Sequence, residues 1–229
     1  MIESYIESVE RDGFAVLQNQ IDAGTVQQLR SDLKDRLSGR EAGIRDLLKR
    51  VPSVLELAQS KSLRTLVESV VGASARVVRG VYFDKQEDAN WKVAWHQDLT
   101  IAVKKRIDVE GFSGWSFKAG IQHVQPPTSI LEQMIAVRIH LDDADETNGC
   151  LRVIPGSHRL GRLTADQITH LRTTKEIVSC VIRNGDVMLM RPLLLHASSV
   201  SLQPAHRRVI HLEYCAATLP KDLEWHEQV

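Results

Sequence analysis

Residues 95–98 read Trp95-His96-Gln97-Asp98, and they place a histidine and an aspartate two positions apart in a segment that we expect to be extended. Successive side chains on a strand point to opposite faces, so His96 and Asp98 share one face. Two ligands placed in this way can hold one side of a metal ion, and a distant histidine, His196, can supply a third bond. The His-x-Asp pair alone is a weak signal, because a chain with 9 histidines also contains such pairs by chance.

Two further motifs follow this pair in the sequence. Residues 148–158 read NGCLRVIPGSH, and residues 195–198 read LHAS, with Arg207 eleven positions after His196. Two histidines and one carboxylate that leave coordination positions open are typical of non-haem Fe(II) oxygenases. With these motifs the chain resembles the phytanoyl-CoA dioxygenase family of Fe(II)/2-oxoglutarate-dependent oxygenases, from about Val77 to Tyr214.

The resemblance implies the cofactors and their ligands. It makes His96, Asp98 and His196 the ligands of Fe(II), and it implies that 2-oxoglutarate and O2 occupy the open positions. The far carboxylate of 2-oxoglutarate needs a permanent planar cation, for which arginine suits better than lysine. Arg207 has the family's spacing from His196, and Ser198 matches the family's carboxylate-binding hydroxyl.

Two arginines leave alternatives open. Strand alternation places Arg208 on the face of Ile210, Leu212 and Tyr214, and Arg207 on the opposite face, so it does not support Arg207 independently. The motif spacing favours Arg207. Arg138 stands where a relative has a tryptophan that contacts the cofactor, so it is a candidate cofactor or substrate contact; an ion pair with Asp142 or Asp143 is the alternative.

Composition limits the other classes of function. The 229 residues suffice for one domain, and 43% hydrophobic and 25% charged residues are ordinary for a globular protein. A formal net charge of +0 argues against a nucleic-acid-binding surface. The 3 cysteines suggest neither a disulfide framework nor a zinc site, and neither a signal peptide nor a membrane span is recognisable. We therefore expect a reduced, cytoplasmic setting, with oligomeric state undetermined.

The chain divides into a helical part, residues 1–74, and a β-rich part, residues 75–218, of a single domain that spans residues 1–229. Apolar residues recur at helical spacing over residues 26–37, 44–51 and 63–71, with Asp22 as a cap and Gly72 as a stop. Short strands are expected at residues 13–17, 76–83, 135–141, 150–154, 177–182, 187–190 and 209–214. This order predicts an α+β fold. The resemblance implies a double-stranded β-helix, or jelly-roll, barrel with the helices outside.

The segment from Arg106 to Gln133 differs from the rest of the β-rich part. It contains glycines and prolines interleaved with Phe112, Trp115, Phe117 and His123, which suggests a long irregular loop. Such loops are often lids or binding loops, so we expect a lid over the substrate, with His123 and Trp115 as possible contacts. The alternative is a loop that only plugs the end of the barrel. Trp91 and Trp95 are expected to pack the barrel.

Taken together, these features predict an Fe(II)- and 2-oxoglutarate-dependent dioxygenase that hydroxylates a small organic molecule and releases succinate and CO2. Two alternatives stay open. One is a cupin-like isomerase or hydrolase that uses the same barrel without 2-oxoglutarate, against which Arg207 and Ser198 argue. The other is a non-catalytic small-molecule-binding module, against which the complete ligand set argues.

Overall fold

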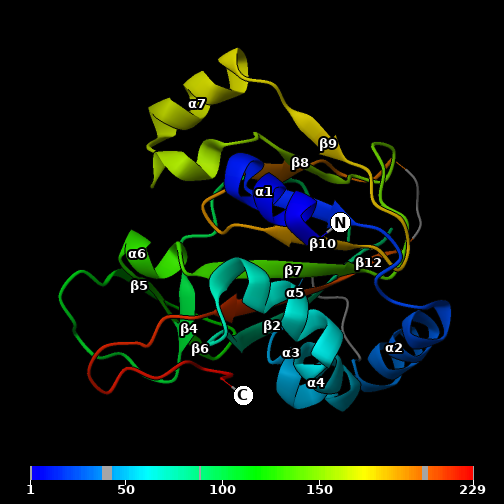
Figure 1. The fold of residues 1–229 in the computed structure, drawn as a ribbon, viewed down its shortest axis with the longest axis horizontal. Helices are drawn as coiled ribbons and strands as arrows, with labels where there is room; N and C mark the ends of the chain where they lie inside the picture. The colour runs from blue at the N-terminus through cyan, green and yellow to red at the C-terminus, as the bar shows by residue number, and fades with distance from the viewer. Residues whose placement is uncertain (1, 38–42, 88, 203–205, 229) are drawn as a thin grey trace.

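The computed structural model describes residues 2–37, 43–87, 89–202 and 206–228. Its N-terminal part is helical and carries one short strand (Figure 1). These elements are α1 (Ile2–Asp12), β1 (Phe14–Leu17), α2 (Ala23–Arg36), α3 (Leu47–Arg50), α4 (Pro52–Gln59) and α5 (Lys61–Val71). Asp22 caps α2, as predicted, by accepting a hydrogen bond from the Thr25 amide at 3.0 Å.

The apolar residues 44–51 do not form the single helix that their spacing predicts. Ile44 pairs with Tyr82 of β2 as an isolated β-bridge, and only Leu47–Arg50 are helical. Pro52 then starts a new helix rather than only ending one, because the first position of a helix needs no amide donor. The spacing thus identified the buried face correctly but not the backbone that presents it.

Two sheets form the barrel. The five-stranded sheet has the order β1-β10-β7-β12-β2, and the four-stranded sheet has the order β3-β11-β8-β9. The added strands are β2 (Arg76–Lys85), β3 (Val93–His96), β7 (Met134–His140), β8 (Leu151–Val153), β9 (Val178–Cys180), β10 (Val187–Met190), β11 (His196–Ser198) and β12 (Arg207–Cys215). All pairings are antiparallel, as in the predicted α+β jelly roll.

The turn at Asn184-Gly185 does not join paired strands. Gly185 has φ 85°, and a Cβ atom there would lie 2.6 Å from the Ile21 carbonyl oxygen, so glycine is required. The strands on either side, β9 and β10, belong to different sheets. The turn therefore carries the chain from one layer of the barrel to the other.

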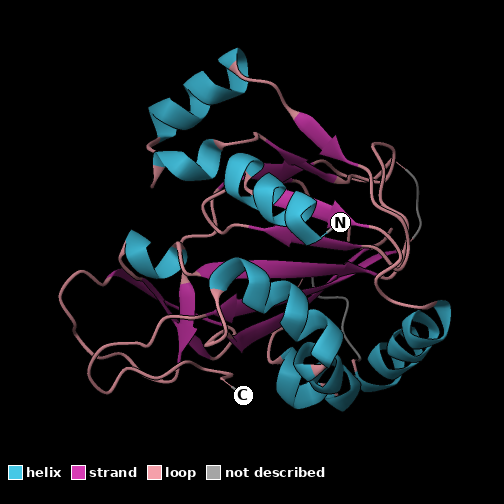
Figure 2. Cartoon of the chain, in the orientation of Figure 1, coloured by secondary structure: helices cyan, strands magenta, loops and turns pink. Residues whose placement is uncertain are grey.

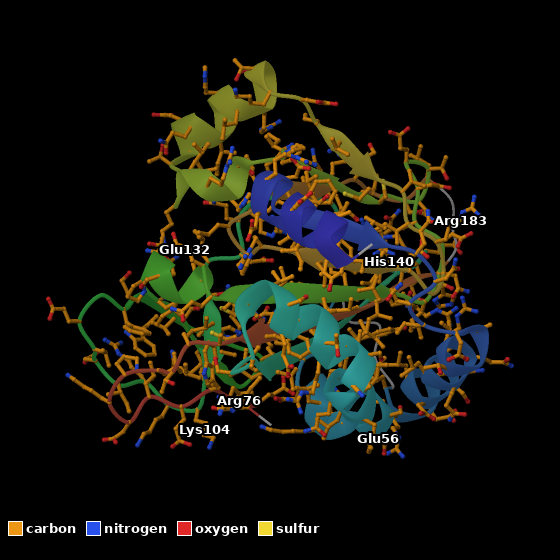
Figure 3. The ribbon with its side chains drawn as sticks, in the orientation of Figure 1. Glu56, Arg76, Lys104, Glu132, His140 and Arg183 are labelled. Atoms are coloured by element: carbon orange, nitrogen blue, oxygen red, sulfur yellow. The ribbon has the colours of Figure 1, made fainter. Side chains whose placement is uncertain are left out.

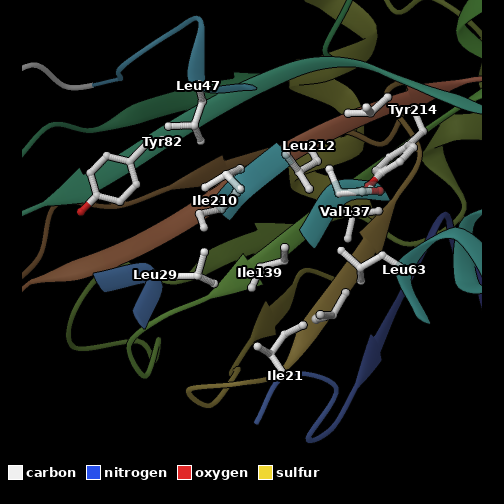
Figure 4. Close-up of a cluster of buried hydrophobic side chains, with 14 of the residues drawn as sticks. Ile21, Leu29, Leu47, Leu63, Tyr82, Val137, Ile139, Ile210, Leu212 and Tyr214 are labelled. Carbon is white, nitrogen blue, oxygen red and sulfur yellow. The ribbon is translucent and has the colours of Figure 1, made fainter. Parts of the chain in front are cut away.

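The main hydrophobic core lies between the five-stranded sheet and the helices that cover its outer face (Figures 1 and 2). Along β12, Ile210, Leu212 and Tyr214 point into this core and meet Leu29 and Leu63 from the helices (Figure 4). His211 and Glu213, which alternate with these residues, line the interior of the barrel. The polar inner face of the barrel is thereby separated from the apolar outer face.

The segment from Arg106 to Gln133 is more regular than predicted. It contains β5 (Ser113–Lys118), β6 (Ile121–Gln125) and α6 (Thr128–Leu131), and β5 and β6 form a three-stranded sheet with β4 (Ile101–Val103). Phe112 and Trp115 pack against a separate hydrophobic cluster, whereas the Phe117 side chain is 71% exposed. The expectation of a structureless loop is wrong, because the glycines mark turns around a hairpin.

A further helix, α7 (Ala165–Thr174), follows the short 3-10 helix Ser157–Leu160 and lies beside β8 and β9 in Figure 1. The sequence predicted only strands and loops in this part of the chain. Thr164 and Gln167 begin α7 with reciprocal side-chain to backbone hydrogen bonds, a capping signal that was visible in the sequence. Among the described residues, no helix is both long and apolar enough to cross a bilayer.

Candidate metal centre and active site

The structure brings His96, Asp98 and His196 together, as predicted. His96 ends β3 and His196 begins β11, and the two residues face each other directly across the antiparallel pair. Their Nε2 atoms lie 3.5 and 3.8 Å from the two Asp98 carboxylate oxygens. One potential ligand atom from each residue lies within 4.8 Å of the others, so a single metal ion can contact all three.

Backbone carbonyls orient both imidazole rings. His96 Nδ1 donates to the Ala94 carbonyl at 2.8 Å, and His196 Nδ1 donates to the Leu194 carbonyl at 2.9 Å. A carbonyl oxygen can only accept, so the proton of each ring is on Nδ1 and the lone pair is on Nε2. This is the usual outer arrangement around a metal-binding histidine, and it fixes both the ring orientation and the tautomer.

Gln97 holds the segment that carries the ligands in place. Its side chain is buried, donates to the carbonyls of Gly161 and Leu193 at 2.8 and 2.7 Å, and accepts from the Leu163 amide at 2.8 Å. The backbone amide of Asp98 also donates to the Pro192 carbonyl at 2.9 Å. The residue between the two ligands therefore fixes the position of both.

The protonation states suit metal binding. Burial lowers the pKa of His196 to about 4, so this imidazole is neutral at neutral pH. Burial alone would raise the pKa of Asp98, but His196 and His96 hold it well below its usual value. The site thus offers an ionised carboxylate and at least one neutral imidazole, which are the forms that bind a metal.

The three residues line a cavity of about 180 Å³ inside the barrel. Its walls come from β2, β3, β7, β8, β11 and β12 and from the segments on either side of β3. No residue of the segment 106–133 is among its lining residues, so His123 and Trp115 are not on the cavity wall. Trp91 lines the cavity, contrary to its expected packing role, whereas Trp95 packs against a small hydrophobic cluster as expected.

Arg207 and Ser198, the predicted carboxylate-binding pair, both line this cavity and are buried. Arg207 has no ion-pair partner among the described residues, and its Nε atom is buried without a hydrogen bond. Burial and the nearby Arg138 lower the pKa of Arg207 to about 10. A buried guanidinium that lacks a carboxylate is unfavourable unless an anion binds to it, so this end of the cavity fits an acidic ligand.

Lys85 is a residue of this end that the sequence analysis missed. It is fully buried at the end of β2, opposite Arg207 in the strand pairing. Its ammonium donates to Ser198 Oγ at 3.2 Å and also to the Ser199 carbonyl. Lys85 lies on the same face of β2 as Phe83, Val81 and Arg79, so strand alternation could have placed it in the cavity wall. The expected strand, however, stopped at Phe83.

The neighbouring Arg208 points to the other face of β12. Its guanidinium contacts both oxygens of Asp142, at 2.7 and 2.8 Å, and Asp142 also accepts from Arg30 of α2 at 2.9 Å. Arg208 therefore joins the sheet to a covering helix. Of the two candidates, only Arg207 lines the cavity.

Arg138 also lines the cavity, which excludes its alternative role as a partner of Asp142 or Asp143. It is buried, and its Nη1 donates to His211 Nδ1 at 3.1 Å. His211 Nε2 lies 3.5 Å from Glu213, and Glu213 accepts from Arg79 at 2.9 Å. These four side chains, Arg138, His211, Glu213 and Arg79, form a connected polar group along the cavity wall.

Two other histidines are buried without contributing ligands. His140 on β7, labelled in Figure 3, has no hydrogen-bond partner at either ring nitrogen within the described ranges, and burial lowers its pKa well below the usual value. His123 donates from Nδ1 to the Ile121 carbonyl at 3.0 Å, and burial and Arg79 lower its pKa to about 4. Both imidazoles are therefore neutral at neutral pH.

The comparisons with known proteins agree with this geometry. The family model described as phytanoyl-CoA dioxygenase (PhyH) matches residues 9–209. The chain belongs to the phytanoyl-CoA dioxygenase family. This confirms the family predicted from the sequence, and the cluster of His96, Asp98 and His196 matches the ligand set that the resemblance implied.

The individual relatives share little sequence with this chain. Phytanoyl-CoA dioxygenase 1 from Oryza sativa subsp. japonica is 28% identical over 162 residues, which cover 66% of this chain and 48% of the rice protein. The matched part thus spans about half of that relative. Among solved structures, the epimerase SnoN from nogalamycin biosynthesis is 18% identical with a TM-score of 0.73, covering 95% of this chain and 81% of that one. EctD from S. alaskensis with 2-oxoglutarate and 5-hydroxyectoine is 20% identical with a TM-score of 0.72, covering 92% of this chain and 74% of that one. Both structural likenesses confirm the predicted fold.

Proposed function

We propose that this chain is an Fe(II)- and 2-oxoglutarate-dependent dioxygenase that hydroxylates a small organic molecule. In the reaction, 2-oxoglutarate loses CO2 and takes one atom of O2 to become succinate, while the other atom becomes the hydroxyl group of the product. The observation that carries the proposal is Arg207, which is buried, has no ion-pair partner in the part of the chain that the structure describes, and lines the same cavity as His96, Asp98 and His196. A metal site and an anion site that share one cavity suit a metal-chelating acid.

In this proposal His96, Asp98 and His196 hold the iron, which supplies the oxidation chemistry when bound. The paired carbonyls of Ala94 and Leu194 keep both imidazole lone pairs directed at the metal position. Gln97 and the Asp98 amide keep the ligand segment rigid. The protein therefore contributes orientation and leaves one side of the metal accessible from the cavity.

Arg207, Ser198 and Lys85 hold the far carboxylate of 2-oxoglutarate in the proposal. Arg207 offers a planar guanidinium, and Ser198 and Lys85 offer a hydroxyl and an ammonium beside it. Arg138, also buried in the cavity wall, is proposed to contact the bound cofactor from the strand beside β12. A carboxylate at this end offsets the cost of burying Arg207.

Three finer expectations also belong to the proposal. O2 is the co-substrate, the protein works in the cytoplasm, and the hairpin within residues 106–133 covers the substrate. Its position in a separate sheet beside the barrel is compatible with a cover at the barrel end. None of its residues lines the cavity, so we propose a covering role and no direct contact with the reacting atoms.

Anaerobic titration of the protein with Fe(II) and 2-oxoglutarate tests the proposal. The expected result is one bound iron and the weak visible absorbance of the iron–2-oxoglutarate chelate. The variants His96→Ala, Asp98→Ala and His196→Ala should lose the absorbance, and when O2 is admitted they should form no succinate, while remaining folded. His170→Ala, which removes an exposed histidine on α7, is the matched control. Iron binding without any 2-oxoglutarate chelate would contradict the proposal.

A further inference from the structure

The cavity has a second polar region outside the proposed cofactor contacts. With Arg207, Ser198 and Lys85 assigned to 2-oxoglutarate and Arg138 proposed to contact it, Arg79, His211 and Glu213 remain along the walls formed by β2 and β12. Phe83 and Val81 form an apolar wall beside it on β2. A substrate that approaches the metal must therefore contact both polar and apolar surface.

We propose that the substrate carries an acidic group, most simply a carboxylate, and that Arg79 binds it. This inference rests on the proposed function, because it takes the other end of the cavity as occupied by 2-oxoglutarate. It names the substrate class that the proposed reaction leaves open. The proposal follows from the charges of the cavity and from which guanidinium remains available.

The charges that line the cavity do not balance. Three guanidiniums, Arg79, Arg138 and Arg207, face two carboxylates, Asp98 and Glu213. The doubly charged iron and the doubly charged 2-oxoglutarate cancel each other, so one positive charge is left, and the adjacent Lys85 adds another. Excess charge in a partly enclosed site is costly, and a singly charged anionic substrate reduces it.

Arg79 is the guanidinium that can receive this anion. Arg207 belongs to the cofactor end, and Arg138 is buried and donates to His211. Arg79 donates only from Nη1 to Glu213 among the described residues, which leaves its other N–H groups unused. Its side chain is 17% exposed, so it is partly accessible where the other two are buried.

Glu213 keeps Arg79 in position, but its single negative charge does not neutralise both guanidiniums of this polar group. Glu213 accepts from Arg79 at 2.9 Å and lies 3.5 Å from His211, so one carboxylate serves two partners. Because His211 Nδ1 accepts from Arg138, the His211 proton is on Nε2, facing Glu213. These four side chains thus contain one carboxylate, which contacts Arg79 and His211, and two guanidiniums, Arg79 and Arg138, so the group keeps a net positive charge for the substrate.

The test measures binding, not turnover. The wild-type protein is loaded anaerobically with Fe(II) and saturating 2-oxoglutarate, the chelate absorbance is recorded, and calorimetry then follows titration with 4-methylpentanoate or with its neutral amide, 4-methylpentanamide. The acid should bind roughly tenfold to a hundredfold more tightly than the amide, the range that a hydrogen bond to a charged group provides. The chelate absorbance must persist throughout, which shows that the acid has not displaced 2-oxoglutarate.

Variants assign the preference to Arg79. Arg79→Gln should abolish the difference between acid and amide, and Arg79→Lys should retain part of it. Arg208→Gln, which breaks an arginine–carboxylate pair outside the cavity, is the matched control and should leave the difference unchanged. If Arg79→Gln is unstable because Glu213 is left alone, the double variant Arg79→Gln/Glu213→Gln removes both charges together and must also lose the preference.

The outcomes separate the two proposals. Absence of the chelate absorbance in the wild type contradicts the proposed function, and this inference falls with it. A normal chelate with equal binding of acid and amide, with binding of neither, or with an unchanged preference in Arg79→Gln overturns the inference alone. Loss of the preference in Arg79→Gln with an intact chelate supports it.

Discussion

At the scale of single residues, Arg207 and Arg208 show where strand alternation helps and where it misleads. Alternation correctly separates the two arginines onto opposite faces of β12. Arg208 shares the face of Ile210 and Leu212, which would suggest that Arg208 points inward, but this apolar face meets the covering helices. The polar face, with Arg207, lines the cavity. On β12, which the helices cover, the apolar face is therefore the outer one.

The first prediction separates these two arginines by their effect on cofactor binding. Arg207→Ala should weaken 2-oxoglutarate binding by roughly a hundredfold or more, because breaking a buried pair leaves an uncompensated charge at a cost of about 3–5 kcal/mol. Arg208→Ala should leave the cofactor affinity nearly unchanged and should instead reduce stability through the lost contact with Asp142. Anaerobic titration of both variants measures this. A larger loss of affinity in Arg208→Ala would show that the assignment is reversed.

The second prediction concerns Lys85 and pH. Burial and the neighbouring Arg207 lower the pKa of Lys85 to about 8. An anion bound beside Lys85 favours its charged form, so the complex keeps a proton that the free protein loses above pH 8. The 2-oxoglutarate dissociation constant of the wild type should therefore rise as the pH increases through about 8, approaching tenfold per unit.

The variant Lys85→Met should bind 2-oxoglutarate about tenfold more weakly at neutral pH and should lack this rise between about pH 8 and 9. Lys104→Met, which removes an exposed lysine paired with Glu224 at 2.5 Å, is the control and should behave as the wild type. An unchanged pH profile in Lys85→Met would rule out Lys85 as the titrating group.

At the scale of elements, β2 and β12 supply most of the cavity's charged wall, and the sequence predicted both strands but not their shared function. The expected strands covered residues 76–83 and 209–214. In the structure, β2 continues to Lys85 and β12 begins at Arg207. Arg79, Lys85 and Glu213 were missed because a charged residue on a strand usually faces solvent. Their contacts depend on pairings between residues 134 and 113 positions apart, which no local pattern reports.

The third prediction concerns Gly149, in the motif that helped to identify the fold. Gly149 has φ 74°, and a Cβ atom there would lie 2.4 Å from the Ser199 carbonyl oxygen and 3.2 Å from Lys85 Nζ. Gly149→Ala should lower the free energy of unfolding by roughly 2–5 kcal/mol, combining the left-handed backbone cost with overpacking. It should also weaken 2-oxoglutarate binding, because Ser199 and Lys85 must move.

Gly120→Ala is the matched control for this substitution. Gly120 has φ 79°, but no heavy atom lies within 4 Å of the position a Cβ would take. The control should therefore lose only the backbone contribution, about 1–2 kcal/mol, and should keep its cofactor affinity. Urea denaturation and cofactor titration of both variants test the comparison. Equal effects would mean that the contact with Ser199 is unimportant.

At the scale of the whole molecule, the sequence predicted the class of fold and the ligand set because both depend on short motifs with defined spacing. His96 and Asp98 are two residues apart, and the family resemblance located His196 and Arg207 relative to them. The regular structure of residues 106–133 was not predicted, because its glycines and prolines resemble those of a loop. The covering of sheet edges was also not predicted, because it uses segments that are distant in the sequence.

The last prediction concerns one such edge. β2 carries Arg79 and Lys85 and lies at the edge of the five-stranded sheet, where unpaired backbone groups need partners. Ile44 pairs with Tyr82, and the buried Glu227 accepts hydrogen bonds from the amides of Gly80 at 2.9 Å and Leu48 at 3.1 Å. Glu227 thus gives a hydrogen-bond acceptor to a backbone amide of β2, which forms part of the cavity wall, and links this strand to α3.

Glu227→Ala leaves these two amides without their acceptor, and it should lower the free energy of unfolding by about 2–5 kcal/mol, since each unsatisfied buried donor costs about 1–3 kcal/mol. Glu224→Ala, three residues earlier, removes an exposed partner of Lys104 and should leave the free energy of unfolding nearly unchanged. Urea denaturation measures both variants. If Glu227→Ala is as mild as Glu224→Ala, water replaces the carboxylate at this edge, and the end of the chain does not support the cavity wall.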